Sequence, residues 1–373
     1  MNILINATNL KQGGGIQVAQ SICAQLGRFP KHRFTVALNS LINDSQIEFE
    51  SNAKVYKYDT KHNIKSLLLG RDTFLDNLVR NENIDAVLTV FGPSIWRPKV
   101  PHLCGFARAQ LILKDSPYYQ KRSLKEKVVH KIWAWSFRKC SNVFYTENSY
   151  ISRILENFFK GAKVYTVTNY YNQVFDQPEK WNKSIVLPQF EGVTCLSISN
   201  HYLHKNFEII EGIVKYLKKE HPGFNVRFVV TFDEKEMPIP ADIRDSIIYT
   251  GKVDVSECPY LYEQCDIMFM PTLMECFTAT YPEAMRMGKP IVTTDLEFAR
   301  GLCGEAACYY SAVDPKAAAE AIYMVATQKE YAARLVENGM KQLLTYDNYE
   351  KRAEKLVHIL EGMVKTTGKG NVI

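Results

Sequence analysis

Residues 271–295 read PTLMECFTATYPEAMRMGKPIVTTD, and this stretch decides the fold class. The apolar run at 267–270 predicts a buried strand, and residues 290–294 predict a second strand. Between them lie a loop that carries Glu275 and a helix whose first turn holds Glu283. A strand, loop, helix and strand in this order are typical of an α/β protein with parallel sheets.

Glu275 and Glu283 flank the predicted turn from strand to helix. Open parallel sheets bind ligands at this edge, where the carboxyl ends of strands meet the amino ends of helices. Backbone N–H groups there suit a diphosphate, and a nearby carboxylate suits a sugar or ribose diol, so the pattern favours a nucleotide sugar. A structural alternative is a capping box with Thr280 as N-cap and Glu283 at N3, which would leave Glu275 unexplained.

The motif PxxxExF(x)5EAMxxGKPIV, carried by residues 271–292, resembles the signature of the retaining GT-B glycosyltransferases of family 4. The resemblance implies that the E-x7-E pair lies in the donor-binding domain. Glu275 would then face the donor sugar as a catalytic residue, and Glu283 would hold the ribose hydroxyls. Residues 248–253 match the strand and turn that the family places beside the base, which assigns Val253 to the donor site.

The resemblance also implies the architecture, two Rossmann-like domains with parallel sheets facing across a cleft. Polar residues with little apolar periodicity at 169–183 place the boundary between the domains. We therefore expect an acceptor-binding domain at 1–172 and a nucleotide-sugar donor-binding domain at 173–345. Residues 346–373 are expected to form a helix that packs back on the N-terminal domain, followed by a frayed tail from residue 366.

Two segments of the N-terminal half are further candidates. Gly14 and Gly15 follow the first predicted strand and open a helix, which indicates either a simple tight turn or a backbone that approaches a ligand. The family places an equivalent glycine loop against the donor phosphates or the acceptor. Family members also carry a histidine near the reacting sugar, and that place falls here near Ala107 and Arg108. Arg108 would act in catalysis or would be an ordinary surface or salt-bridged arginine.

Lys205 lies close to the predicted start of a helix, where the helix dipole disfavours a cation unless an anion binds beside it. The resemblance gives the same assignment, a lysine on the diphosphate, helped by loop amides near Phe277 and Thr278. The family often has an arginine six residues before this lysine, whereas this chain has Ser199. We expect no cofactor and no required metal, because Lys205 and backbone dipoles can carry the phosphate charge.

The composition fits an ordinary two-domain protein. The chain has 373 residues, of which 46% are hydrophobic and 23% charged. Its start lacks the pattern of a signal peptide, and no apolar run is long enough to predict a transmembrane helix. The nine cysteines are scattered without a C-x-x-C pair, as expected for buried thiols in a reducing compartment, so we expect a cytoplasmic protein that could act at the inner face of the cell membrane.

Residues 121–139 read KRSLKEKVVHKIWAWSFRK, with seven Lys or Arg and one Glu, a net charge of +6. A basic, aromatic, amphipathic helix suits an anionic membrane surface or an acidic acceptor. The alternative is a domain helix with a solvated basic face and a buried aromatic face. No nucleic-acid-binding module is recognisable, so nucleic acid is not an expected partner.

The resulting hypothesis is an enzyme that transfers a hexose or related sugar, with retention, from a nucleotide diphosphate sugar to an acceptor hydroxyl. The acceptor would be a glycan or a lipid-linked glycan, and the setting polysaccharide or glycoconjugate biosynthesis. The rival hypothesis is a non-catalytic nucleotide-sugar-binding protein of the same fold, since fold alone does not settle activity.

Overall fold

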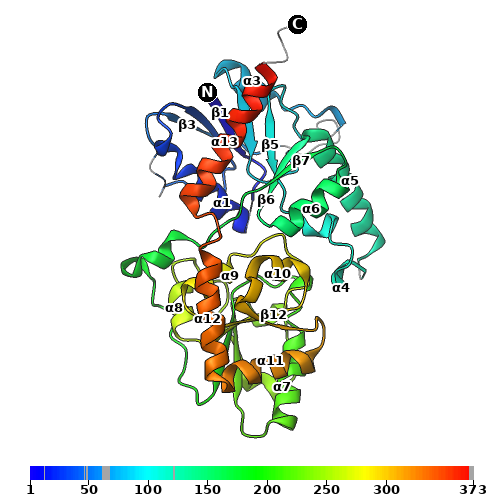
Figure 1. Ribbon diagram of the computed structural model, residues 1–373, viewed down its shortest axis with the longest axis vertical. Helices are drawn as coiled ribbons and strands as arrows, with labels where there is room; N and C mark the ends of the chain where they lie inside the picture. The colour runs from blue at the N-terminus through cyan, green and yellow to red at the C-terminus, as the bar shows by residue number, and fades with distance from the viewer. Residues whose placement is uncertain (12, 46, 48, 61–67, 121, 369–373) are drawn as a thin grey trace. The chain divides into compact units, whose positions relative to one another are not determined.

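The computed structural model describes residues 1–11, 13–45, 47, 49–60, 68–120 and 122–368. They form two compact units (Figure 1). Unit 1 comprises Met1–Leu113, Arg122–Asn169 and Asp347–Ile373, and unit 2 comprises Lys114–Lys121 and Tyr170–Tyr346. The main division after Asn169 lies three residues before the expected boundary. The segment that begins at Lys114, expected within the first domain, belongs to unit 2.

Unit 1 is built on a seven-stranded parallel sheet with the order β3-β2-β1-β4-β5-β6-β7. Its strands are β1 (Asn2–Ala7), β2 (Arg33–Leu38), β3 (Ala53–Lys57), β4 (Ala86–Thr89), β5 (His102–Gly105), β6 (Val143–Thr146) and β7 (Lys163–Thr166). Side chains alternate between the two faces of a strand. Accordingly, Ile3 and Ile5 join one hydrophobic cluster, and Leu4 joins a second.

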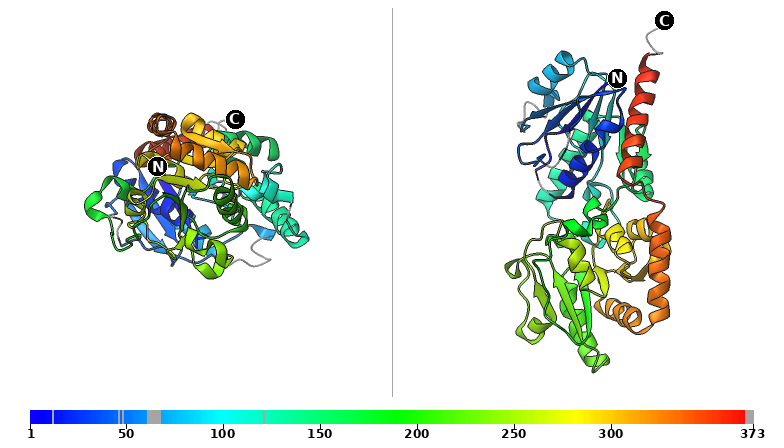
Figure 2. Two further views of the ribbon diagram at one scale, coloured as in Figure 1. Left: turned by 90° about the horizontal axis from the view of Figure 1, so that it is seen from below. Right: turned by 90° about the vertical axis from the view of Figure 1, so that its left-hand side faces the viewer.

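Both faces of this sheet are covered by helices. These are α1 (Gly14–Cys23), α3 (Thr73–Asn81), α5 (Leu124–Cys140), α6 (Ser149–Phe158) and α13 (Tyr349–Gly368). The C-terminal helix α13 lies along the sheet (Figure 2) and buries Leu356 and Leu360 in the cluster that contains Ile3 and Ile5. Residues 366–368 continue α13 as a helix, so the expected start of the tail at residue 366 was wrong.

The base of α13 is also held by polar contacts. Arg352 is buried, and its guanidinium donates to Asn169 Oδ1 and, over 2.6 Å, to Ser21 Oγ of α1. Lys355 pairs with Asp347 over 2.6 Å. These contacts attach the last segment of the chain to unit 1.

Unit 2 contains a six-stranded parallel sheet with the order β10-β9-β8-β11-β12-β13. Its strands are β8 (Val193–Ser197), β9 (Val226–Val230), β10 (Ile247–Tyr249), β11 (Ile267–Met270), β12 (Ile291–Thr294) and β13 (Ala307–Tyr310). The helices of this unit are α4 (Pro117–Gln120), α7 (Ile209–Glu220), α8 (Cys258–Glu263), α9 (Thr280–Arg286), α10 (Glu297–Cys303), α11 (Pro315–Thr327) and α12 (Lys329–Leu343).

The two units therefore have the expected class, an α/β chain with two parallel sheets. In unit 2 the buried strand residues Phe228 and Phe269 pack edge to face with ring centroids 5.4 Å apart. Such burial of large apolar side chains is the main favourable contribution to folding. Within the described residues, no helix has both the length and the apolar composition needed to cross a bilayer.

Candidate functional site

The candidate site lies at the carboxyl edge of the unit 2 sheet. Strands β8 and β11 are parallel neighbours, so the loops that follow them start side by side. The loop after β8 leads to the 3-10 turn Leu203–Lys205, and the loop after β11 carries Glu275. Lys205 Nζ and Glu275 Oε1 form an ion pair, and the two side chains are only 10% and 13% exposed. The fold thus joins two predicted site residues that are seventy positions apart in the chain.

Hydrogen bonds fix these two loops to one another. The Leu273 N–H donates to the His204 carbonyl oxygen over 2.7 Å. The Thr272 hydroxyl lies 3.2 Å from Glu275 Oε1, and the Ser116 hydroxyl donates to the Leu273 carbonyl over 2.7 Å. Because both loops are tied to each other, the Lys205–Glu275 pair is held on a supported backbone.

Glu283 lies on the adjacent helix. The alternative prediction, that it forms a capping box with Thr280, was wrong. Helix α9 begins at Thr280, and Ala279 is the N-cap and makes no side-chain capping bond. The Glu283 carboxylate is buried and instead accepts a 3.4 Å hydrogen bond from the Tyr262 hydroxyl. Burial raises the pKa of Glu283 from 4.5 to about 7, against the opposing effect of the Tyr262 hydrogen bond.

The other predicted donor residues occupy the same edge of the sheet. Thr278 is buried, with its hydroxyl 2.9 Å from that of Thr280. Phe277 is half-buried and meets Tyr346 edge to face, with ring centroids 6.1 Å apart. Val253 is half-buried in the loop after β10, at the end of the strand order, so β9 and β8 separate it from β11.

The sequence did not indicate two further side chains near this site. Asn206 follows Lys205 in a left-handed conformation (φ 56°), and its buried Nδ2 has no hydrogen-bond partner among the described residues. Tyr262 lies on the short helix α8 and makes the hydrogen bond to Glu283. Neither belongs to a motif. Only the fold brings them to the site, although Asn is the non-glycine residue that most readily adopts this conformation.

The remaining predicted residues belong to unit 1. Helix α1 begins at Gly14, followed by Gly15, and its N-cap Gly13 has a φ of 75° and provides no side-chain cap. The N-cap of α1 therefore provides no side chain to accept hydrogen bonds from the first-turn N–H groups. Arg108 follows β5, and its guanidinium lies over the ring of Trp133 on α5, 4.4 Å from the centroid.

His102 on β5 has a structural role, as its early position in the strand indicates. Its ring nitrogens lie 2.8 Å from the Thr89 hydroxyl and 2.8 Å from the Cys140 carbonyl oxygen. Burial lowers the pKa of His102 to about 4, so the imidazole is neutral near pH 7.

Comparisons with known proteins bear on the same elements. Residues 193–328, which include the Lys205–Glu275 pair and Glu283, match the family model described as glycosyl transferases group 1. Sucrose-phosphate synthase from Thermosynechococcus elongatus superposes with a TM-score of 0.71 over 98% of this chain and 99% of its own, at 14% identity. The fold is GT-B.

Further solved GT-B structures agree with this assignment. WaaG, a glycosyltransferase involved in lipopolysaccharide biosynthesis, gives a TM-score of 0.67 over 97% of this chain and 100% of its own, at 14% identity. HepE from Anabaena, in complex with UDP and glucose, gives 0.64 over 96% and 99%, at 11% identity. These likenesses confirm the predicted GT-B fold.

A curated relative covers less of the chain. An uncharacterized glycosyltransferase of Haemophilus influenzae is 30% identical over 111 residues, which are 28% of this chain and 31% of the relative. The match therefore spans less than a third of that relative's length.

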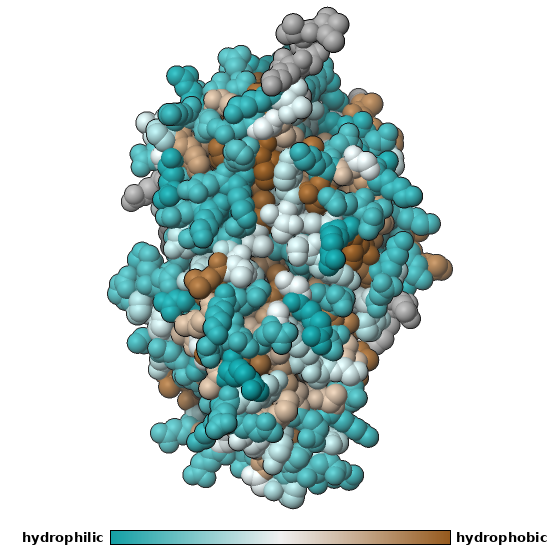
Figure 3. Space-filling model, in the orientation of Figure 1, coloured by the Kyte–Doolittle hydropathy of each residue, from teal (hydrophilic) through white to brown (hydrophobic). Residues whose placement is uncertain are grey.

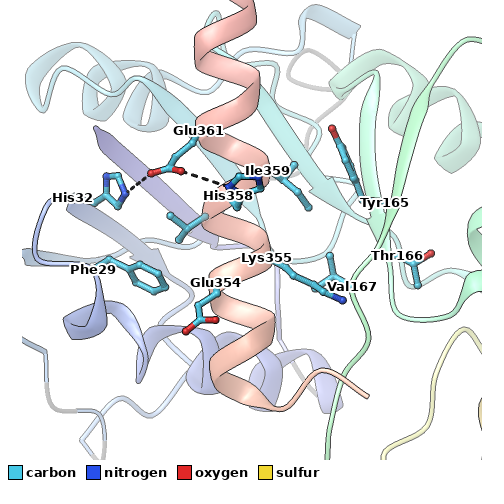
Figure 4. Close-up of a pocket in the computed structure, with 11 residues that line it drawn as sticks. Phe29, His32, Tyr165, Thr166, Val167, Glu354, Lys355, His358, Ile359 and Glu361 are labelled. Atoms are coloured by element: carbon cyan, nitrogen blue, oxygen red, sulfur yellow. Dashed lines mark hydrogen bonds and ion pairs between the residues drawn. The ribbon is translucent and has the colours of Figure 1, made fainter. Parts of the chain in front are cut away.

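Two cavities of unit 1 lie apart from the predicted residues. The first, of about 670 Å³, borders α13 and is lined mainly by apolar surface, including Phe29, Val167 and Ile359 (Figure 4). Figure 3 shows patches of hydrophobic surface (brown) among the hydrophilic residues of this unit. At the margin of the cavity His32 and His358 lie 3.0 and 3.8 Å from Glu361. None of the predicted site residues lines this cavity. It lies where α13 packs on its sheet.

Proposed function

We propose that this chain is a retaining glycosyltransferase of family 4 that transfers a hexose or related sugar from a nucleotide diphosphate sugar to an acceptor hydroxyl. The observation that carries the proposal is the Lys205–Glu275 ion pair at the carboxyl edge of the unit 2 sheet. It lies in the segment that matches glycosyl transferases group 1, and Glu283 completes the E-x7-E motif.

In this proposal Lys205 binds the diphosphate, together with loop N–H groups near Phe277 and Thr278. Glu275 contacts the donor sugar. Negative charge develops on the diphosphate as the glycosidic bond breaks, and fixed positive groups aimed at it would stabilise the transition state. The buried Nδ2 of Asn206, next to Lys205 in the chain, has no hydrogen-bond partner in the part of the chain that the structure describes. This supports a polar ligand here, because a buried donor without a partner costs about 1–3 kcal/mol.

Glu283 would bind the ribose hydroxyls in its ionised form, and Val253 would lie beside the base. The carboxylate is buried, and its one hydrogen-bond partner among the described residues is the Tyr262 hydroxyl. An ionised carboxylate has room for several donors, so it could accept both ribose hydroxyls as well. This would offset the cost of keeping its charge in a buried site.

In this proposal the acceptor binds to unit 1, where it contacts Arg108, Gly14 and Gly15. The acceptor would be a glycan or a lipid-linked glycan in polysaccharide or glycoconjugate biosynthesis on the cytoplasmic side. WaaG, one of the structural neighbours, is a glycosyltransferase involved in lipopolysaccharide biosynthesis, which supports this setting.

A second candidate is a non-catalytic nucleotide-sugar-binding protein. Its support is that Arg108 stacks on Trp133, as a structural arginine would.

A thermal-shift screen of nucleotide sugars first identifies the donor, since a ligand at 100 times its dissociation constant should stabilise by about 2.7 kcal/mol. Release of the nucleoside diphosphate is then measured with and without extracted glycan acceptors. Retention is read from the anomeric configuration of the product by NMR. Tight binding of a donor without any release of nucleoside diphosphate would favour the second candidate.

A further inference from the structure

Helix α5 exposes an apolar stripe to solvent. Leu124, Val128, Ile132 and Trp135 are 81%, 58%, 43% and 38% exposed. Their spacing of four, four and three residues places them on one face of the helix. The opposite face is buried through Phe137 and packs on unit 1, so the stripe is not part of the core.

Basic residues flank this stripe on both sides. At about 100° per residue, Lys125 lies on one side of the apolar stripe, and Lys127, Lys131 and Arg138 lie on the other. All four are exposed. The single acidic residue of the helix, Glu126, is held in a capping box with Ser123 at the first turn. A helix with an apolar face between two basic margins is typical of helices that lie in the plane of a membrane interface.

A basic cavity continues this surface at the end of α5. It has a volume of about 660 Å³ and lies where β5, β6 and β7 begin. Arg97, Arg138, Lys139 and Lys163 line it, and none of the described residues that line it is an Asp or Glu. Four cationic groups without a carboxylate favour an anionic partner. Figure 1 shows α5 at the margin of unit 1, beside α6.

We propose that this surface of unit 1, the stripe of α5 with its basic margins and the basic cavity, docks on a lipid bilayer that contains anionic phospholipids. The stripe would enter the interface, and the lysines and arginines would meet the lipid phosphates. A second copy of the chain fits less well, because a symmetric contact through this surface would bring like charges together. The inference does not depend on the proposed sugar transfer.

The test measures partitioning of the full chain onto vesicles of phosphatidylcholine with or without phosphatidylglycerol, by co-sedimentation. We expect binding only to the vesicles with phosphatidylglycerol, and weaker binding at high salt. The double variant Lys125→Ser/Lys131→Ser should partition roughly thirtyfold more weakly, since each lysine near an anionic surface contributes about 1 kcal/mol. The charge-matched control is Lys316→Ser/Lys329→Ser on exposed sites of unit 2, which should bind as wild type.

The apolar stripe is tested separately. Leu124→Ser/Val128→Ser keeps every charge of α5 and should also lose vesicle binding, while circular dichroism stays unchanged because both side chains are exposed. Quenching by brominated lipids should act on Trp135 and disappear in Trp135→Phe, whereas buried Trp96 should give no quenching.

Three results would overturn the proposal. One is equal binding of wild type and both α5 variants. Another is loss of binding in the control variant to the same degree. The third is that wild type forms a dimer without lipid and the variant Leu124→Ser/Val128→Ser is a monomer, which would assign the stripe to self-association. Donor hydrolysis in solution should be unchanged in all the α5 variants, so failure of the docking inference and failure of the proposed chemistry are distinguishable.

Discussion

Replacing Glu283 by glutamine separates the proposed ribose contact from a structural role. The side chain keeps its size and one oxygen acceptor but loses its ionisable group. Helix α9 is not capped by Glu283, so the change removes no capping bond. The 3.4 Å hydrogen bond from Tyr262 can be retained by the amide oxygen. The variant should therefore differ from wild type mainly through charge.

The stability effect follows from the burial of the carboxyl group. Its pKa in the folded chain is raised from 4.5 to about 7. Between these values the unfolded chain loses the proton while the folded chain keeps it, so wild-type stability falls as the pH rises from about 4.5 to about 7. At about 1.4 kcal/mol per pKa unit, the loss approaches about 3 kcal/mol above pH 7. Glu283→Gln lacks this loss and should gain stability relative to wild type between pH 5 and pH 8.

Donor binding should change in the opposite direction. A hydrogen bond to a charged acceptor is worth about 1.5–3 kcal/mol, so Glu283→Gln should weaken donor affinity about tenfold or more. Wild-type affinity should itself weaken as the pH falls below about 7, because the carboxyl group takes up a proton there. The variant's affinity should lack this pH dependence.

Both effects can be measured on the same samples. Chemical unfolding of unit 2 and calorimetric donor titration are followed from pH 5 to pH 8. Glu263→Gln is the matched control, since Glu263 is exposed on neighbouring α8. Unchanged donor affinity, or a variant that is less stable than wild type at pH 8, would refute the reasoning.

Three other predictions concern Lys205, the metal requirement and Arg108. Lys205→Met should destabilise the chain by about 3–5 kcal/mol because it leaves Glu275 unpaired, and Lys205→Met/Glu275→Gln should recover much of this in unfolding experiments. In the double variant, donor and nucleoside diphosphate should bind more weakly than in Glu275→Gln while the nucleoside is unaffected; equal losses for all three would exclude a phosphate contact. EDTA should leave turnover largely intact, and a loss restored by magnesium would contradict metal-free transfer. Arg108→Ala should slow transfer to the acceptor with donor hydrolysis unchanged; equal slowing of both would place Arg108 outside the acceptor site.

The strands were predictable from the sequence because they are short apolar runs at turn signals. Strand β11 has the predicted ends, and β12 begins one residue after the predicted start at 290. The parallel arrangement follows from alternation with helices. Short helices such as α8 and α10, of six and seven residues, were not predicted. Such elements carry too few apolar repeats for a helical period to be recognised, and tertiary packing decides them.

The site was predictable only in part. The E-x7-E spacing pointed to Glu275 and Glu283 as candidates, but Thr280 three residues before Glu283 also suggested a capping box that does not form. A cap depends on where the helix starts, and periodicity locates helix ends poorly. The pairing of Lys205 with Glu275 depends on β8 and β11 being neighbours, which the order of strands in the chain does not specify.

This pairing has a consequence for donor selection. With the Lys205–Glu275 pair buried, a diphosphate that takes Lys205 leaves the Glu275 carboxylate without its cation. A buried charge that loses its partner is costly. An intact donor would compensate, because a sugar hydroxyl can donate to Glu275 as the diphosphate meets Lys205, whereas the free nucleoside diphosphate supplies no such group.

Glu275→Gln should therefore tighten the nucleoside diphosphate relative to the intact donor, because a neutral amide loses little when Lys205 turns to phosphate. Calorimetric titration of wild type and Glu275→Gln with both ligands measures this ratio of affinities. If Glu275→Gln weakens both ligands equally, the pair is a structural contact that stays closed when the donor binds. A shift toward the nucleoside diphosphate would mean that exchange of this ion pair makes binding selective for a donor that still carries its sugar.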